Sequence, residues 1–92
     1  MRLDELSKVL KDQQIVKIIS NKIFPVGWTF SNEDIKSFGY YDSDFYGIKV
    51  LKIYSNSDSS DIFIVIDCNN DELNDFIKKF DDFYDSKNFL KK

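Results

Sequence analysis

Apolar residues near the start of the chain recur with the spacing of a helix. Leu3, Leu6 and Leu10 follow one another at intervals of three and four residues, with charged residues between them. This spacing places the apolar side chains on one face of a helix. It predicts a short amphipathic helix over residues 2–12, lying as a cover on a sheet.

A second short helix is predicted in the middle of the chain. Ser31 is followed three residues later by an acid, and this arrangement resembles a capping box. Gly39 is a residue type that often ends a helix. The pattern therefore predicts a helix over residues 32–38.

The clearest helical pattern lies near the end of the chain. Asn69 can cap a helix and Glu72 can reach back to it, while acids near this position suit the positive N-terminal end of a helix. We expect this helix to end near Ser86. Its apolar stripe consists of Leu73, Phe76, Ile77, Phe80, Phe83 and Tyr84.

Three segments carry the residue types of strands. Residues 14–24 are rich in β-branched side chains, which favours a strand, although a continuation of the first helix remains an alternative. Residues 46–54 and 61–67 enclose a polar loop over 55–60 and predict an antiparallel hairpin. Ile62–Ile66 is apolar on both faces, so we expect a helix or a second subunit to cover its outer face.

These elements predict an α+β fold. The expected order is α-β-α-β-β-α, with a small antiparallel sheet of about three strands. One helix is N-terminal, a short one lies in the middle of the chain, and a long one is C-terminal. A chain of 92 residues fits one compact domain spanning 1–92, and we expect the Lys-rich tail 87–92 to fray.

Composition narrows the chemistry. The chain has no histidine, which excludes His-dependent nucleophilic triads, and it has 42 % hydrophobic residues with fifteen aromatics, which predicts an ordered core of rings and isoleucines. One cysteine, Cys68, can form neither an internal disulfide nor a zinc site alone, so we interpret it as a buried thiol at a strand end.

Acids near the start and the lack of a long apolar stretch predict a cytoplasmic protein without a membrane segment.

The acids are concentrated in two blocks. Residues 31–46 hold four acids against one base, and residues 58–85 hold nine acids against two bases. Such blocks disfavour direct nucleic-acid binding, because a phosphate backbone requires basic residues. The complement of these blocks is a basic protein surface.

Two acidic patterns are candidates for functional sites, but neither has all the features that such a site needs. Asp67-x-Asn69-x-Asp71 has the first spacings of a calcium loop, but a glutamate stands where the loop needs glycine and Lys78 where it needs glutamate. We therefore predict no metal and no cofactor. The carboxylate pairs that could serve acid–base catalysis are Glu33/Asp34, Asp42/Asp44 and Asp81/Asp82, and a solvated surface is the default interpretation of each.

The segment 38–47 is the strongest candidate for a binding surface. It mixes five aromatics with two acids and two glycines, and tyrosines are frequent anchors of protein interfaces. The alternative is that these rings simply pack under a loop, and we interpret Trp28 as core or rim in the same way. The predicted partner-binding residues are Glu33, Asp34, Tyr40, Tyr41, Asp42, Asp44, Phe45 and Tyr46, with a secondary set of Asp75, Asp82 and Asp85.

These properties predict a small inhibitor rather than an enzyme. The partner would be a nuclease or CRISPR effector whose basic substrate-binding site the acids and tyrosines cover, as in phage anti-CRISPR or other anti-defence proteins and in toxin immunity proteins. A homodimeric structural or regulatory module that self-associates through the sheet is the first alternative. A small hydrolase that uses one of the carboxylate pairs is the second.

Overall fold

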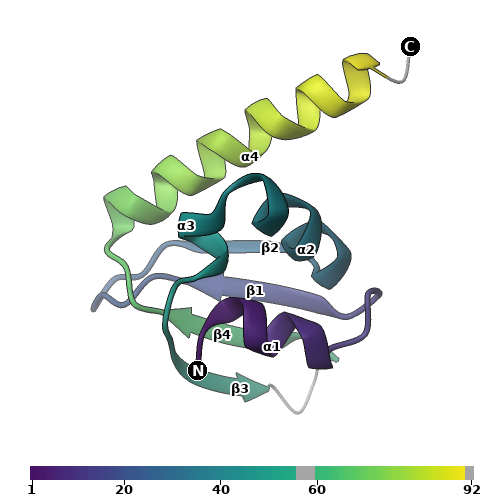
Figure 1. The fold of residues 1–92 in the computed structure, drawn as a ribbon. Helices are drawn as coiled ribbons and strands as arrows, with labels where there is room; N and C mark the ends of the chain where they lie inside the picture. Colours follow the sequence, from purple (N-terminus) through teal and green to yellow (C-terminus); the bar gives the residue numbers. More distant parts are fainter. Residues whose placement is uncertain (56–59, 91–92) are drawn as a thin grey trace.

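The described part of the chain forms four helices and a four-stranded sheet, arranged as in Figure 1. The computed structural model describes residues 1–55 and 60–90, with side chains up to residue 85. The α+β class is confirmed, but the order is α-β-β-α-α-β-β-α. The elements are α1 (Leu3–Val9), β1 (Ile15–Ile19), β2 (Gly27–Ser31), α2 (Asn32–Tyr41), α3 (Ser43–Tyr46), β3 (Val50–Ser55), β4 (Ile62–Ile66) and α4 (Asn70–Leu90).

The sheet is mixed rather than antiparallel. Its strand order is β2-β1-β4-β3, and the two central strands, β1 and β4, run parallel. The outer pairs, β1 with β2 and β3 with β4, are antiparallel. The prediction of about three antiparallel strands is therefore wrong, because Gly27–Ser31 turns back on β1 as a further strand and β4 returns beside β1.

Several boundaries differ from the predicted ones. The segment 14–24 is a strand only over Ile15–Ile19 and does not continue the first helix. α2 does not stop at Gly39 but runs on to Tyr41, and the α4 backbone stays helical to Leu90, so residues 87–90 of the predicted tail belong to the helix. Residues 56–59 of the predicted polar loop and residues 91–92 of the tail lie outside the described residues.

The core has an aliphatic part between the sheet and the helices. All helices of the described chain lie on one side of the sheet, with α1, α2 and α3 over its face and α4 crossing above them (Figure 1). Burying the large aliphatic side chains of this layer away from water is its main stabilising contribution. Its fully buried members include Leu3, Val16, Ile18, Ile35, Ile64 and Ile66.

An aromatic cluster attaches α4 to the rest of the molecule. Phe80 of α4 lies with its ring centroid 4.6 Å from that of Trp28 and 5.5 Å from that of Phe38. Phe76 packs edge-on against Phe45 with centroids 5.3 Å apart. Edge-to-face pairs of this kind add to the stabilisation from buried area, so the aromatic residues and isoleucines do form the core as predicted.

The opposite face of the sheet carries no helix of the described part of the chain. Phe63 and Val65 of β4 point to this outer face and are half-buried, and Tyr54 stacks on Phe63 with centroids 5.1 Å apart. Of the two covers expected for the outer face of β4, a helix or a second subunit, no helix lies there in the described residues. In the described residues, no helix has both the length and the apolar character needed to cross a bilayer.

Candidate partner-binding surface

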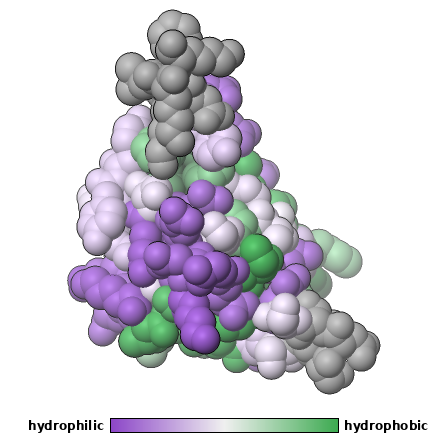
Figure 2. All heavy atoms as spheres, turned by 90° about the vertical axis from the view of Figure 1, so that its right-hand side faces the viewer, coloured by the Kyte–Doolittle hydropathy of each residue, from purple (hydrophilic) through white to green (hydrophobic). Residues whose placement is uncertain are grey.

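The helix α2 begins directly after its N-cap residue, Ser31, and presents two different faces. The Ser31 hydroxyl accepts a hydrogen bond from the Asp34 backbone N–H at 3.3 Å, which satisfies a donor at the start of the helix. Helical spacing places Glu33 and Tyr40, seven residues apart, on one face, and both are exposed. The end of the molecule that holds the start of α2 is mainly hydrophilic at its centre (Figure 2).

The other face of α2 turns toward α4. The Tyr41 ring lies 4.9 Å from the Phe83 ring between centroids, yet 63 % of Tyr41 remains exposed. Asp34 lies seven residues before Tyr41, on the same face of the helix. The predicted residues of α2 therefore divide between an outward face and a face beside α4.

Asp42 joins helices rather than offering a free carboxylate. Its side chain accepts hydrogen bonds from the backbone N–H groups of Asp44 and Phe45 at 3.1 and 3.3 Å, which caps α3. Its second oxygen lies 3.6 Å from Nζ of Lys79 on α4. Only 11 % of the Asp42 side chain is exposed, whereas Asp44 is exposed on the outer side of α3.

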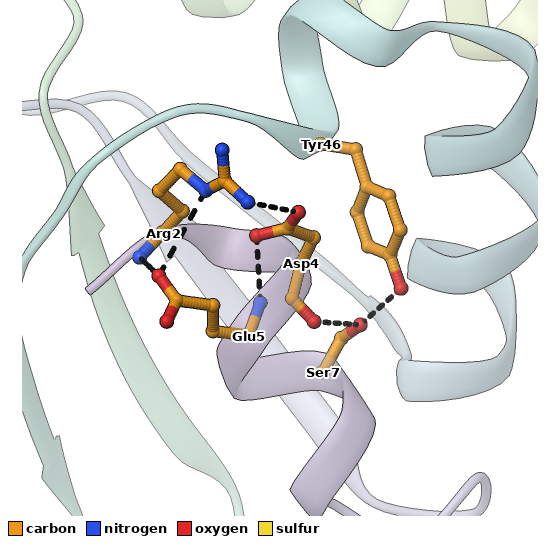
Figure 3. Close-up of polar contacts among 5 residues, drawn as sticks. All are labelled: Arg2, Asp4, Glu5, Ser7 and Tyr46. Atoms are coloured by element: carbon orange, nitrogen blue, oxygen red, sulfur yellow. Dashed lines mark hydrogen bonds and ion pairs between the residues drawn. The ribbon is translucent and has the colours of Figure 1, made fainter.

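The two aromatic residues at the end of the predicted segment belong to the core. Phe45 is fully buried and Tyr46 is 8 % exposed. The Tyr46 hydroxyl and Oγ of Ser7 are hydrogen-bonded at 2.6 Å, which connects α3 to α1 (Figure 3). These two positions correspond to the alternative interpretation, in which rings of this segment pack inside the molecule.

The carboxylates of α4 separate by helix face. Asp75 and Asp82 are exposed and do not line the groove between β2, α2 and α4. Asp85 instead borders a groove, together with Asp34 of α2 and Asp81. The structure thus brings Asp34 and Asp85 together, although the sequence analysis assigned them to separate sets.

This groove contains residues that the sequence analysis did not select. It has a volume of about 420 Å³ and lies between β2, the start of α2 and the later turns of α4. Its residues are Trp28, Thr29, Phe30, Asp34, Phe80, Asp81, Tyr84 and Asp85. The spacing of Asp81, Tyr84 and Asp85 along one helix face was the available signal, but the contribution of β2 depended on a strand that was not predicted.

The described residues offer little metal or thiol chemistry. They contain no group of three or more acidic or cysteine side chains placed to hold a metal ion. Asn69 and Glu72 form the predicted capping box, since each side chain accepts a hydrogen bond from the other's backbone N–H at 2.8 and 3.1 Å. Cys68 is a buried thiol just after β4, as predicted, and burial raises its pKa to about 11, helped by Glu72 and Asp67. A thiol with this pKa is a weak nucleophile at neutral pH.

The described surface combines two kinds of exposed side chain. It offers exposed tyrosines and carboxylates, which can contact and pair with basic side chains. Comparisons with protein-family models, with curated proteins and with solved structures found no match to this chain.

Proposed function

We propose that this chain is a small, non-enzymatic inhibitor that binds a basic surface of a nucleic-acid-handling enzyme. The observation that carries the proposal is the exposure of two neighbouring tyrosines, Tyr40 at 80 % and Tyr41 at 63 %, close to exposed acids. Large rings left in water at a helix end are typical of interface anchors. Phe45 and Tyr46 are buried, so the proposed surface consists of Tyr40, Tyr41, Glu33, Asp34 and Asp44.

The proposed mechanism is occlusion of a substrate-binding site. Carboxylates of Glu33 and Asp44 would pair with arginines or lysines that otherwise hold nucleic-acid phosphates, while the tyrosines contribute contact area. The net charge of −3 is far below that of a DNA duplex, which carries one charge per about 1.7 Å, so local complementarity is the basis of binding. Phage anti-CRISPR or other anti-defence proteins and toxin immunity proteins are the classes that this mechanism describes.

Affinity capture from a lysate of the organism that encodes the chain, or of its host, tests the proposal. We expect a basic nuclease or nuclease complex to bind at low salt and to elute as salt rises, because screening weakens pairing between exposed charges. Replacing Glu33 and Asp44 by lysine should abolish the capture. Replacing Tyr40 and Tyr41 by serine should weaken it at all salt concentrations.

A matched variant separates local pairing from net charge. Asp67 and Asp71 are also exposed but lie at the β4–α4 connection, outside the proposed surface. The Asp67→Lys/Asp71→Lys variant changes the charge by the same amount and should still capture the partner. Equal loss of capture in both charge-reversed variants, or an eluted protein without nucleic-acid chemistry, would contradict the proposal.

A homodimeric module is the second candidate function, and one observation favours it. The outer sheet face carries the half-buried Phe63 and Val65 with no helix of the described chain packed on them, and β3 is an edge strand with exposed Leu51 and Ile53. An apolar sheet face of this kind can pack against a second copy across a two-fold axis. This candidate requires a dimer, whereas occlusion requires only a monomer.

A further inference from the structure

The groove between β2 and α4 combines an aromatic floor with an acidic rim. Trp28 and Phe30 of the edge strand β2 lie with ring centroids 4.2 Å apart, and Phe80 meets Trp28 edge-on from α4. Tyr84, one turn further along α4, stacks on Phe80 with centroids 5.9 Å apart at an interplanar angle of 22° and is 46 % exposed. Trp28 is half-buried and Tyr84 is partly exposed, so part of the ring surface in the groove meets solvent.

Three carboxylates surround this aromatic floor. Asp81 and Asp85 stand four residues apart on α4, so their charges repel each other, and Asp34 borders the groove from α2. In the described part of the chain, no lysine or arginine lies within ion-pair distance of any of the three. The free groove thus gathers negative charge that a bound cation would neutralise.

We propose that this groove receives an arginine side chain from a basic segment of the partner protein. A guanidinium is planar and can stack on the accessible ring surface of Trp28 or Tyr84, where a cation is attracted by the π-electrons. Its forked N–H groups can also donate to the Asp81 or Asp85 carboxylate in a bidentate pair. Lysine offers neither the plane nor the fork, and a phosphate group would be repelled by the same carboxylates.

The inference rests on the proposed function, since it names the side chain by which the basic partner is recognised. It adds a second contact region to the one around Tyr40. The two regions share Asp34, but Glu33 and Tyr40 on the outward face of α2 belong only to the first region, and Asp81 and Asp85 belong only to the groove. They can therefore be mutated separately.

A titration with a short blocked peptide tests the groove without a known partner. The probe is acetyl-Gly-Arg-Gly-Arg-Gly-amide at low salt, with the peptide that has glutamine in place of arginine as its control. Trp28 is the only tryptophan in the chain and lines the groove, so its indole N–H signal in ¹H–¹⁵N spectra and its fluorescence are assigned without ambiguity. We expect saturable shifts at Trp28, Thr29 and Tyr84 with the arginine peptide and none with the glutamine peptide.

Variants of α4 show whether the rim carboxylates are responsible. Asp81→Asn/Asp85→Asn should weaken peptide binding by about tenfold, because it removes the charge-assisted hydrogen bonds. Asp71→Asn/Asp75→Asn removes the same charge from the same helix outside the groove and should bind as the wild type does. Equal weakening by both pairs, shifts away from the groove, or equal shifts with the glutamine peptide would overturn the inference.

The same variants separate this inference from the proposed function. A partner whose capture depends on Glu33 and Asp44 but not on Asp81 and Asp85 would overturn the groove contact and leave the inhibitor in place. Arginine-peptide binding at the groove, combined with no captured nuclease, would support the groove contact and contradict the inhibitor.

Discussion

Gly39 shows how a single residue can fit two opposite local rules. Glycine near the end of a helix predicts a stop, but here the helix continues two residues beyond it, to Tyr41. The reason is tertiary, because a Cβ at position 39 would overlap the ring of Tyr46. Glycine is thus required for the close packing of α3 on α2, and its weak helix propensity is outweighed by that contact.

We therefore expect Gly39→Ala to destabilise the protein although alanine is the better helix former. Propensity alone would stabilise the helix by about 1 kcal/mol. Displacing the buried Tyr46 ring should cost about 1–3 kcal/mol, so the variant should be less stable by up to roughly 2 kcal/mol. Urea unfolding followed by circular dichroism measures this difference. In a Tyr46→Ala background the same substitution should become neutral or stabilising, and a stabilised single variant would show that the ring does not press on position 39.

The candidate binding residues could also be predicted only in part from the type of each residue. The same segment contains exposed Tyr40 and Tyr41 and buried Phe45 and Tyr46, and all four are aromatic residues of the kind that interfaces use. What separates them is Asp42, which ends α2 and caps α3, so the helical phase starts again after it. Residue type alone does not contain this change of direction.

Among the elements, α4 was the most predictable and β2 the least. The capping box of Asn69 and Glu72 and the apolar stripe are local signals, and both operate in the structure. β2 is a short strand with mixed polarity, and its place in the sheet depends on pairing with β1 rather than on its own pattern. Missing β2 also hid the groove, since Trp28 forms part of that groove's floor.

Phe80 should be the main attachment of α4. Its ring contacts those of Trp28, Phe30 and Phe38, so Phe80→Ala removes contacts to β2 and α2 together. We expect a loss of about 3 kcal/mol in the free energy of unfolding and a shift of Trp28 fluorescence toward the red as water reaches the indole. Chemical unfolding monitored by tryptophan fluorescence measures both.

Tyr84→Ala provides the comparison one turn further along α4. Tyr84 is 46 % exposed and stacks on Phe80, so its removal should cost less than about 1 kcal/mol. Equal losses for the two variants would mean that α4 is held along its whole length and not mainly at Phe80.

At the scale of the whole molecule, the central pairing of the sheet was outside the reach of local patterns. β1 and β4 come from distant parts of the chain and run parallel, with Ile18 opposite Ile64. Adjacent hairpins predict antiparallel neighbours, whereas a parallel pair needs the long crossover that α2, α3 and β3 provide. Ile62–Ile66, which is apolar on both faces, lies in the middle of the sheet between β1 and β3.

The uncovered outer sheet face leads to a prediction about the assembly of the whole molecule. Two lysines stand on this face, Lys17 opposite Phe63 and Lys52 opposite Val65, and the stem of Lys17 lies against Gly27. A dimer packed through it would bring four like charges together, and charged residues on exposed sheets oppose such association. We therefore expect sedimentation equilibrium to show a monomer.

Removing these lysines should uncover the tendency of the face to associate. Lys17→Ala/Lys52→Ala should lower the dimer dissociation constant by about tenfold or more, because the repulsion is lost while the apolar area remains. Lys8→Ala/Lys11→Ala removes the same charge from exposed positions near α1 and should leave the protein monomeric. A wild-type dimer that Val65→Lys dissociates would contradict this prediction, because the outer face would then be an interface between two copies and the self-associating module would replace the monomeric inhibitor.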